Sequence, residues 1–397
     1  MSFKDIQQRD QAAVMHTYAR FPVGMQSGKG ATCIDFDGKT YIDFTAGIGV
    51  NSLGFCDDGW IAAVTEQLGT LQHMCNLYYT EPCIKAAEMI KARSGLEKVF
   101  FGNSGAEANE GAIKAARKYS YSNYGPGRSA IVTLQNSFHG RTVTTLAATG
   151  QDVFHKDFYP FTEGFVYAQP NDIADTLAKL DDTVCAVMLE LIQGEGGVTT
   201  LDEAYVASVV AACHEKDILV IADEVQTGIG RTGSFFCYQQ YGFLPDIVTF
   251  AKGIGGGLPL GGILFGKKTE EALLPGDHAS TFGGNPIACA GAVEVLSHMD
   301  EAFYKAVQEK GAYMKSKLET MPHVVQVDGK GLMLGIQLEG VTNKEVVEKA
   351  NEIGVLTLTA GQKVRLLPPL TITYEEMGEG LARLKRALGE FEGGKSL

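Results

Sequence analysis

The sequence predicts an α/β protein with a mostly parallel central sheet and a smaller α+β domain beside it. From about residue 98, short apolar runs alternate with stretches of helical periodicity, as in sheets covered by helices. After Asn285 the pattern changes to helices followed by short strands. A chain of 397 residues also has room for two domains, and we expect both to be present.

The N-terminal segment, residues 1–47, is expected to pack with the smaller domain. It contains the stretch DFDGKTYIDF, in which Asp37-Gly38 is a hairpin signal between two short strands.

Residues 48–287 are expected to form the large domain. Its predicted strands are apolar runs, and its predicted helices are amphipathic stretches near 106–120 and 202–216. The strands are KVFF (98–101), AIVTL (130–134), VCAVMLEL (184–191), LVIADEV (219–225) and IVTFA (247–251). Ligands bind at the carboxyl ends of the strands in such sheets, so polar residues there are candidates for a site.

Residues 288–397 are expected to form the small domain. Helices are predicted from ACAGAVEVLSHM onward, over 301–320, near 343–353 and over 374–391, with strands at GLMLGIQLEG, VLTLT and VRLLPPLTI.

Charge and composition exclude several classes of protein. A net charge of −13 without a basic block disfavours nucleic acid and anionic membranes as partners. No run of about 18 apolar residues is present, and the polar start MSFKDIQQRD does not resemble a signal peptide. The eight cysteines show no C-x-x-C spacing, so we expect reduced thiols, no metal site and a cytoplasmic protein.

The first chemical feature is a pair of acids, Asp223 and Glu224, directly after the apolar run 218–222. A carboxylate at the end of a strand buried on both faces is costly unless a positive group pairs with it. The sequence therefore predicts a cationic partner for Asp223.

The second feature is the stretch FFGNSGAEANEG (100–111), where a strand ends and Ser104-Gly105-Ala106 opens a helix. Free N–H groups and the helix dipole make such a start a phosphate cradle, and Gly105 would let the backbone come close. Ser104 and Glu107 also fit a simple capping box, and the two interpretations are compatible.

The third feature is NSFHGRT (136–142) after the next strand. Phe138 offers a flat face for an aromatic ligand, and Arg141 offers a planar fork for a carboxylate. Taken alone, the same residues fit a turn with a core Phe and a surface Arg, and the role of His139 stays open.

The fourth feature is Lys252, which follows the strand 247–251 and precedes a glycine-rich stretch. Burial lowers the pKa of a lysine and frees a nucleophilic amine, although a lysine that begins a surface turn is commoner.

Two glycine-rich stretches near Lys252 resemble nucleotide-binding motifs but do not match them. GIGGGL (253–258) lacks the last glycine of a dinucleotide motif, and GGILFGKK (261–268) has Lys268 where a P-loop needs a hydroxyl. A P-loop nucleotide enzyme is the weaker alternative.

Together these features form the set that pyridoxal 5'-phosphate (PLP) requires. The cofactor needs a Schiff-base lysine and an acid against its pyridinium nitrogen. Lys252 and Asp223 are the catalytic candidates, and the ring N–H⁺ is the cation expected beside Asp223.

The sequence resembles the class III, fold type I aminotransferases in an ordered set of motifs that spans most of the chain. They are SGAEANE (104–110), FHGRT (138–142), IQGEGG (192–197), ADEVQTGIGRTG (222–233), AKGIGGGLPLGG (251–262) and STFGGNP (280–286). Within the family, HTYARFPV (16–23), DFTAGIGVNSLG (43–54) and VRLLPPLTI (364–372) are most similar to acetylornithine aminotransferases.

The resemblance implies a role for each matching residue. Lys252 binds the cofactor aldehyde and moves protons, and Asp223 faces the ring nitrogen. The other implied cofactor contacts are Ser104, Gly105 and Ala106 at the phosphate, Phe138 and Val225 on the ring faces, Gln226 at the ring hydroxyl, Glu224 beside Asp223, and Thr281 at the neighbouring subunit's phosphate. The implied substrate contacts are Tyr18, Arg141, Glu195, Ser280 and Arg365.

The resemblance also implies a reaction and an assembly. The terminal amine of N2-acetyl-L-ornithine would pass to 2-oxoglutarate in two half-reactions, giving N-acetyl-L-glutamate 5-semialdehyde and L-glutamate, in arginine biosynthesis. Glu195 would neutralise Arg365 when the amine donor binds and release it for 2-oxoglutarate. A homodimer is implied because each site takes Thr281 from its partner. Ornithine, succinylornithine, succinyl-diaminopimelate or 4-aminobutyrate are alternative donors, and a racemase, an aminomutase or a non-catalytic binding module are alternative functions.

Two stretches depart from the family pattern. Residues 54–58 read GFCDD where relatives commonly read GHCHP, and Leu191 replaces a proline. Neither change removes an implied cofactor contact, but both are expected to alter loops near the site.

Overall fold

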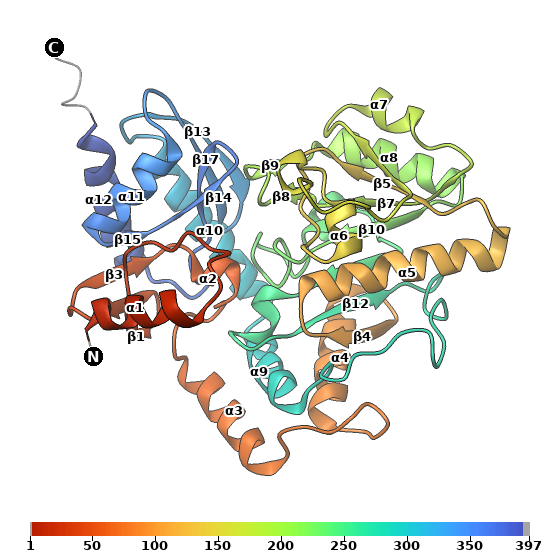
Figure 1. Ribbon diagram of the computed structural model, residues 1–397, viewed down its shortest axis with the longest axis horizontal. Coiled ribbons are helices and arrows are strands. Elements are labelled where there is room, and N and C mark those ends of the chain that lie inside the picture. The colour runs from red at the N-terminus through yellow and green to blue at the C-terminus, as the bar shows by residue number, and fades with distance from the viewer. Residues whose placement is uncertain (1, 392–397) are drawn as a thin grey trace.

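The computed structural model describes residues 2–391, which fold into two lobes joined by a broad contact (Figure 1). One lobe contains the largest sheet, and the other contains the two ends of the described chain and two four-stranded sheets. Across residues 2–391, none of the helices combines the length and the apolar character needed to cross a membrane.

The largest sheet has seven strands in the order β4-β12-β11-β10-β7-β5-β6. Its strands are β4 (Lys98–Gly102), β5 (Ala130–Leu134), β6 (Phe165–Ala168), β7 (Val184–Leu189), β10 (Leu219–Asp223), β11 (Ile247–Phe250) and β12 (Gly261–Phe265). The pairs from β11 through β6 are parallel, whereas β12 runs antiparallel to both β11 and β4. The expected mostly parallel α/β fold is confirmed.

Alternate residues of the central strands face two separate apolar layers. In β10, Leu219 and Ile221 pack with helix α5 (Gly105–Tyr124), whereas Val220 and Ala222 face the larger cluster that contains α8 (Glu203–Glu215). Side chains of successive strand residues point to opposite faces, so an unbroken apolar run is what a sheet covered on both sides requires. The other helices of this lobe are α3 (Asp58–Thr70), α4 (Glu81–Ser94), α6 (Val143–Ala148), α7 (Ile173–Ala178) and α9 (Pro286–Ser297).

The sequence did not predict strands β6 and β12 of this sheet, and β12 is the more instructive of the two. Its two leading glycines look like loop residues, but they are required by close packing. An added Cβ at Gly261 would lie 2.6 Å from the Ser104 carbonyl oxygen, and one at Gly262 would lie 2.6 Å from the Phe100 carbonyl oxygen. Glycine is therefore present because backbone approaches backbone here.

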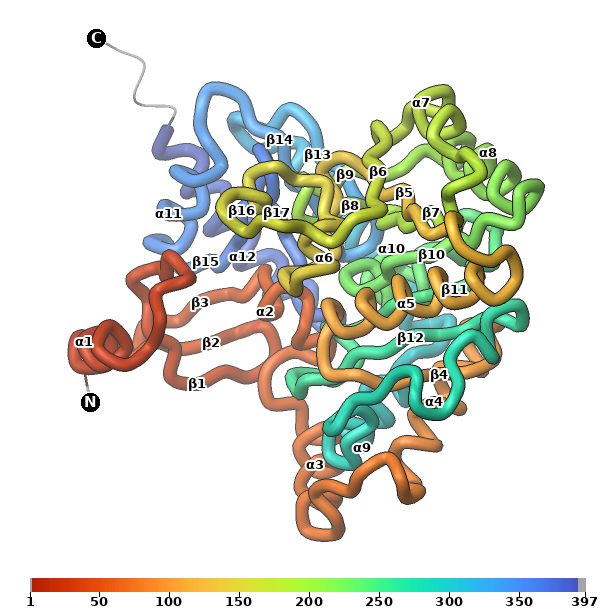
Figure 2. The backbone as a smooth tube through the Cα atoms, turned by 45° about the vertical axis from the view of Figure 1, so that its right-hand side comes forward, coloured from red at the N-terminus to blue at the C-terminus, as the bar shows by residue number. Residues whose placement is uncertain are grey.

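The N-terminal strands share a sheet with a strand from near the C-terminus, in the order β1-β2-β3-β15. The predicted hairpin at Asp37-Gly38 joins β2 to β3, and Ile42 of β3 pairs with Val355 of β15. Figure 2 shows these strands side by side. The elements are α1 (Phe3–Ala13), β1 (Met25–Lys29), β2 (Thr32–Asp35), β3 (Thr40–Asp43), α2 (Ala46–Gly49) and β15 (Val355–Leu356).

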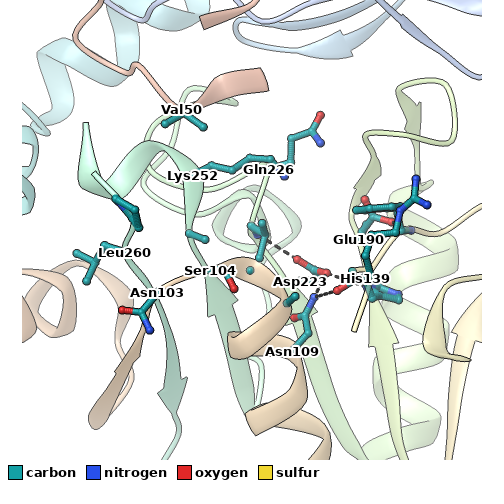
Figure 3. Close-up of a pocket in the computed structure, with 18 of the residues that line it drawn as sticks. Val50, Asn103, Ser104, Asn109, His139, Glu190, Asp223, Gln226, Lys252 and Leu260 are labelled. Atoms are coloured by element: carbon teal, nitrogen blue, oxygen red, sulfur yellow. Dashed lines mark hydrogen bonds and ion pairs between the residues drawn. The ribbon is translucent and has the colours of Figure 1, made fainter. Parts of the chain in front are cut away.

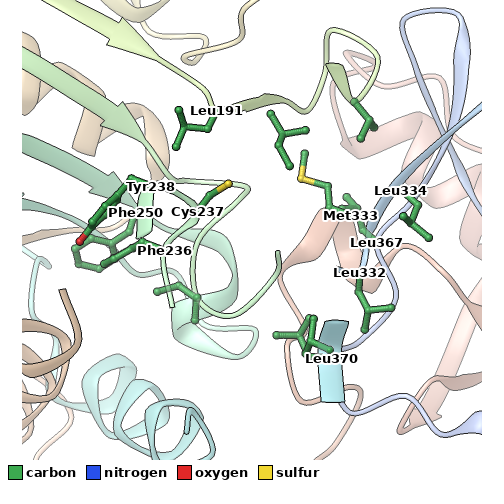
Figure 4. Close-up of a cluster of buried hydrophobic side chains, with 14 of the residues drawn as sticks. Leu191, Phe236, Cys237, Tyr238, Phe250, Leu332, Met333, Leu334, Leu367 and Leu370 are labelled. Carbon is green, nitrogen blue, oxygen red and sulfur yellow. The ribbon is translucent and has the colours of Figure 1, made fainter. Parts of the chain in front are cut away.

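A second four-stranded sheet, β13-β14-β17-β16, completes this lobe with three helices. Its elements are α10 (Glu301–Leu318), β13 (Val324–Lys330), β14 (Met333–Leu338), α11 (Asn343–Ile353), β16 (Leu358–Ala360), β17 (Lys363–Leu366) and α12 (Tyr374–Gly389). Figure 4 shows Phe236 and Tyr238 of the large lobe in the same apolar cluster as Leu332 and Leu367 of the small lobe. The two lobes thus share one core.

The proposed domain boundary between residues 287 and 288 falls inside helix α9, which packs on α3 and α4 of the large lobe. The departure Leu191 is a core residue with 1% exposure, also visible in Figure 4. In the departure GFCDD, Asp57 caps α3 by accepting a hydrogen bond from the Trp60 amide at 2.9 Å, and Asp58 pairs with Lys29.

Candidate active site

A cavity of about 450 Å³ opens at the carboxyl ends of β4, β5, β7, β10 and β11, where the sequence predicted a site. Figure 3 shows side chains from several strand ends and from the start of α5 meeting there. Nine of the predicted residues line it: Ser104, Gly105, Ala106, Phe138, Arg141, Asp223, Val225, Gln226 and Lys252. The other lining residues are Val50, Asn103, Asn109, His139, Gly140, Glu190, Ala251, Gly257, Leu258, Pro259 and Leu260.

Asp223 is the last residue of β10, and only 4% of it is exposed. Its Oδ2 accepts a hydrogen bond from Asn109 Nδ2 at 2.8 Å and contacts His139 Nδ1 at 2.8 Å. Its Oδ1 accepts from the Val225 amide at 3.1 Å. These contacts fix the carboxylate at the cavity wall and give it one direction.

His139 is buried directly behind Asp223. Burial would lower the pKa of His139, but the hydrogen bond to Asp223 and the charges of Asp223 and Glu190 raise that pKa overall. His139 Nε2 has no hydrogen-bond partner among residues 2–391, so Nδ1 makes the ring's polar contact. A protonated His139 would balance the charge of Asp223.

Glu190 follows β7 as Asp223 ends β10, at the next strand of the sheet. It accepts hydrogen bonds from the Phe138 amide at 2.7 Å and the Gly194 amide at 3.2 Å. Burial, with a smaller contribution from the charge of Asp223, raises the pKa of Glu190 to about 7. Through these hydrogen bonds the residue holds the loop that carries Phe138.

Lys252 follows β11 and has a positive φ of 47°, which is uncommon for a residue with a side chain. Its side chain extends across the cavity toward Gln226 (Figure 3). Burial lowers the pKa of Lys252, and the nearby Arg365 lowers it further, while Asp223 and Glu195 oppose the shift. A lysine with a lowered pKa supplies a neutral, nucleophilic amine more readily.

The start of α5 forms the predicted cradle. Ser104 is the N-cap, and its Oγ accepts from the Glu107 amide at 3.2 Å, as a capping residue does. The Glu107 side chain bonds Asn103 rather than Ser104, so the reciprocal half of a capping box is replaced. An added Cβ at Gly105 would lie 2.6 Å from Val225 Cγ1, so only glycine fits beside that wall.

Phe138 and Arg141 lie on one side of the cavity. The Arg141 guanidinium carbon is 5.6 Å from the centre of the Phe138 ring and 3.8 Å from that of Phe154, which are cation–π distances. Arg141 is exposed at the rim and can meet an anion that enters from solvent.

Arg365 and Glu195 form an ion pair at 2.7 Å, and Arg365 is 2% exposed. Arg365 Nη1 also donates to Gln226 Oε1 at 3.1 Å, which connects the pair to the cavity through Gln226. Gln226 fits here because Gly194 has no side chain, as an added Cβ there would lie 2.3 Å from Gln226 Oε1. Arg365 Nε has no partner among residues 2–391.

Four predicted contacts lie away from the cavity. The Glu224 side chain points into the core, where it bonds Thr227 Oγ1 and the Tyr238 amide at 2.8 Å, because adjacent strand residues face opposite sides. Tyr18 is 76% exposed near the N-terminal helix. Ser280 and Thr281 are in a loop outside the cavity wall, and Thr281 is exposed.

Comparison with known proteins decides the family. Residues 13–388 match the family Aminotransferase class-III. The chain belongs to the class III aminotransferases. It is 50% identical to the acetylornithine aminotransferase of Haemophilus ducreyi, covering 98% of this chain and 100% of that protein.

Solved structures agree with this assignment. The ornithine aminotransferase of Toxoplasma gondii superposes with a TM-score of 0.94 at 32% identity, covering 99% of this chain and 96% of that one. A second structure of the Toxoplasma gondii enzyme has the same TM-score and identity, covers 98% of this chain and 95% of that one, and shows PLP at partial occupancy in its active site. This aminotransferase is PLP-dependent, as the sequence predicted.

The cavity fits that cofactor. Asp223 presents a fixed carboxylate, Lys252 presents an amine with a lowered pKa, and Gly105 leaves an open helix start for a phosphate. Phe138 and Val225 supply the flanking walls. When bound, PLP supplies an electron-withdrawing pyridinium ring.

The sequence analysis did not identify two residues that hold the site in place, Asn109, which bonds Asp223, and Glu190, which bonds the Phe138 amide. Asn109 is a buried polar residue on an otherwise alanine-rich helix face, and that contrast was a usable signal. Glu190 follows a buried apolar strand just as Asp223 ends one, so the rule that identified Asp223 applies to Glu190 as well.

Proposed function

We propose that this aminotransferase moves the terminal amine of N2-acetyl-L-ornithine to 2-oxoglutarate, giving N-acetyl-L-glutamate 5-semialdehyde and L-glutamate, as a step of arginine biosynthesis. Its curated relatives at 43–50% identity, which are named acetylornithine aminotransferase, support the choice of donor.

The observation that carries the proposal is the different state of two arginines. Arg141 is exposed at the rim and has no carboxylate partner among residues 2–391, whereas Arg365 is already paired with Glu195. A donor that reacts through its terminal amine has one carboxylate to bind, and Arg141 can take it. 2-Oxoglutarate has two carboxylates and needs a second cation. Glu195 is 28% exposed and can swing away, which frees Arg365 for that second carboxylate.

Each residue of the cavity has a separate proposed role in binding the cofactor or in moving a proton. Asp223 holds the charge opposite the ring nitrogen, with Asn109 and His139 keeping its direction. Lys252 would hold the cofactor through its aldehyde, and its Nζ would be the group that takes up and releases the proton during amine transfer. The Gly105 and Ala106 amides, with Ser104, hold the phosphate, and Gln226 bonds the ring hydroxyl. Phe138 and Val225 exclude water from the ring faces.

The proposal includes a homodimer whose subunits complete each other's sites. The loop with Ser280 and Thr281 is tied to residue 76, because Asn76 Nδ2 donates to the Ser280 and Gly283 carbonyls. Beside it, Leu77, Tyr79 and Phe282 are 88%, 96% and 61% exposed, an apolar surface of the kind that pairs with another chain. In the dimer, the partner subunit's Thr281 would reach the phosphate.

We also propose a cytoplasmic location. All eight cysteines have free thiols, the state that a reducing compartment maintains.

Initial rates with a panel of donors test the proposal. With 2-oxoglutarate fixed, we expect the highest kcat/KM for N2-acetyl-L-ornithine and lower values for ornithine, succinylornithine, succinyl-diaminopimelate and 4-aminobutyrate. Lys252→Ala is the control and should lose turnover with every donor. A higher value for another donor would reassign the substrate, and turnover without any 2-oxo acid would indicate a racemase or aminomutase.

A further inference from the structure

Helices α4 and α9 pack against each other (Figure 1), and each carries a cysteine that does not line the cavity. Cys83 is in the first turn of α4, and Cys289 is in the first turn of α9. The two thiols lie close enough for each to shift the pKa of the other. Cys289 is fully buried in the main core, whereas Cys83 packs against that core and is partly exposed. Cys83 is therefore the more accessible residue of the pair.

The environment makes the two thiols chemically unequal. The hydrogen bond from Cys289 lowers the pKa of the Cys83 thiol, against the opposing effect of burial. The same contact, together with burial, raises the pKa of the Cys289 thiol. Cys83 is also near the positive end of the α4 dipole, which favours a thiolate. The accessible thiol is thus the better nucleophile, and a protonated thiol stands beside it.

The pair is connected to the active site through the loop 280–285. An added Cβ at Gly284 would lie 2.8 Å from Cys83 Sγ, so the sulfur rests against the loop backbone. At the other end of the loop, Ser280 Oγ bonds Asn103 Nδ2 at 3.1 Å, and Asn103 lines the cavity. Thr281 lies between these two contacts. A movement of Cys83 is therefore transmitted to the loop that bears Thr281.

We propose that Cys83 and Cys289 form a reversible disulfide that lowers turnover when the enzyme meets a peroxide. The Cys83 thiolate attacks one oxygen of hydrogen peroxide, the O–O bond breaks, and a sulfenic acid and hydroxide form. The Cys289 thiol then attacks that sulfur, the S–S bond forms, and water leaves. In total, two thiols lose two electrons and two protons while one hydrogen peroxide becomes two waters.

The bond draws the two sulfurs to about 2.05 Å, far closer than a thiol–thiol contact. The Cys83 side chain must turn toward Cys289, which removes its support from Gly284 and shifts the loop. This consequence for turnover rests on the proposed role of Thr281, whereas the disulfide itself does not.

Peroxide treatment of the reduced holoenzyme tests the proposal. After quenching and alkylation of free thiols, non-reducing digestion and mass spectrometry identify linked peptides, and amine transfer is measured in parallel. We expect a Cys83–Cys289 peptide and a loss of turnover of about fivefold or more, with dithiothreitol reversing both. Cys56→Ser, which removes an exposed thiol away from the pair, should behave as the unchanged enzyme does.

Two variants separate the oxidation of Cys83 from the formation of the disulfide. Cys289→Ala should keep its turnover at first, form no linked peptide, and accumulate irreversibly oxidised Cys83. Cys83→Ser, at the partly exposed position, should resist peroxide altogether. A treated enzyme in which Cys56 is oxidised and the pair stays reduced would overturn the proposal, as would a linked pair with unchanged turnover. A reduced enzyme that transfers no amine would instead refute the proposed function, while the linked peptide would still be measurable.

Discussion

The inner wall of the cavity and its outer rim differ in how firmly neighbouring residues hold their side chains. At the inner wall, Asp223 is 4% exposed and held by Asn109 and His139, all from the same chain. At the rim, Arg141 is exposed, and the predicted contacts Thr281 and Tyr18 lie apart from the cavity. The sheet thus holds the residues of the inner wall in place, whereas the predicted substrate contacts at the rim and beyond it are more exposed.

The largest expected effect comes from the inner wall. Asp223→Asn keeps the shape but removes the charge opposite the ring nitrogen, so turnover should fall about 10³-fold, the scale of losing a preorganised electrostatic group. The neighbouring Glu224→Gln is a matched control, because its side chain faces the core. Steady-state rates of both variants check this, and equal losses would remove the distinction between the two acids.

A rim residue should act on binding more than on chemistry. Arg141→Leu removes a charged hydrogen-bond partner of a carboxylate, which costs about 1.5–3 kcal/mol, so KM for the amine donor should rise roughly 10- to 100-fold. Turnover at saturating donor should change much less. Separate determination of kcat and KM tests this, and a fall in kcat alone would place Arg141 with the inner wall.

The Glu195–Arg365 pair is between the two regions, and its removal should change preference. Glu195→Gln leaves Arg365 without its anion. The rate of the half-reaction with L-glutamate should therefore rise, and the rate of the half-reaction with N2-acetyl-L-ornithine should fall. The ratio of the two should shift about tenfold, or about 1.4 kcal/mol. Single-turnover rates with each amino acid measure the ratio, and an unchanged ratio would exclude a switching role for Glu195.

The last expected effect concerns stability and its pH dependence, and leaves turnover unchanged. Burial raises the pKa of Glu224 from 4.5 to about 7, so between these values the native state holds a proton that the unfolded chain releases. The free energy of unfolding should therefore fall as pH rises through this window, by roughly 2–3 kcal/mol from this residue. Urea unfolding at pH 5 and pH 8 should show a smaller decline for Glu224→Gln. An equal decline would mean that Glu224 does not titrate there.

The sequence predicted the inner wall better than its supports and the rim. Asp223, Lys252 and Phe138 each follow a buried strand, and parallel strand ends meet at one edge, so order along the chain was enough to bring them together. The sequence did not predict the contact of Asn109 with Asp223, because that contact depends on which face of α5 meets β10. Glu224 was assigned to the cofactor by sequence, although strand alternation sends it into the core.

Chemical fixing of the bound cofactor tests the central claim most directly. Borohydride reduction of the holoenzyme, followed by digestion and mass spectrometry, identifies the lysine that carries PLP. We predict that the label is on Lys252 alone and is lost in Lys252→Ala, which still binds the cofactor without a covalent link. A label on another lysine would show that the chemistry of this cavity has been assigned to the wrong residues.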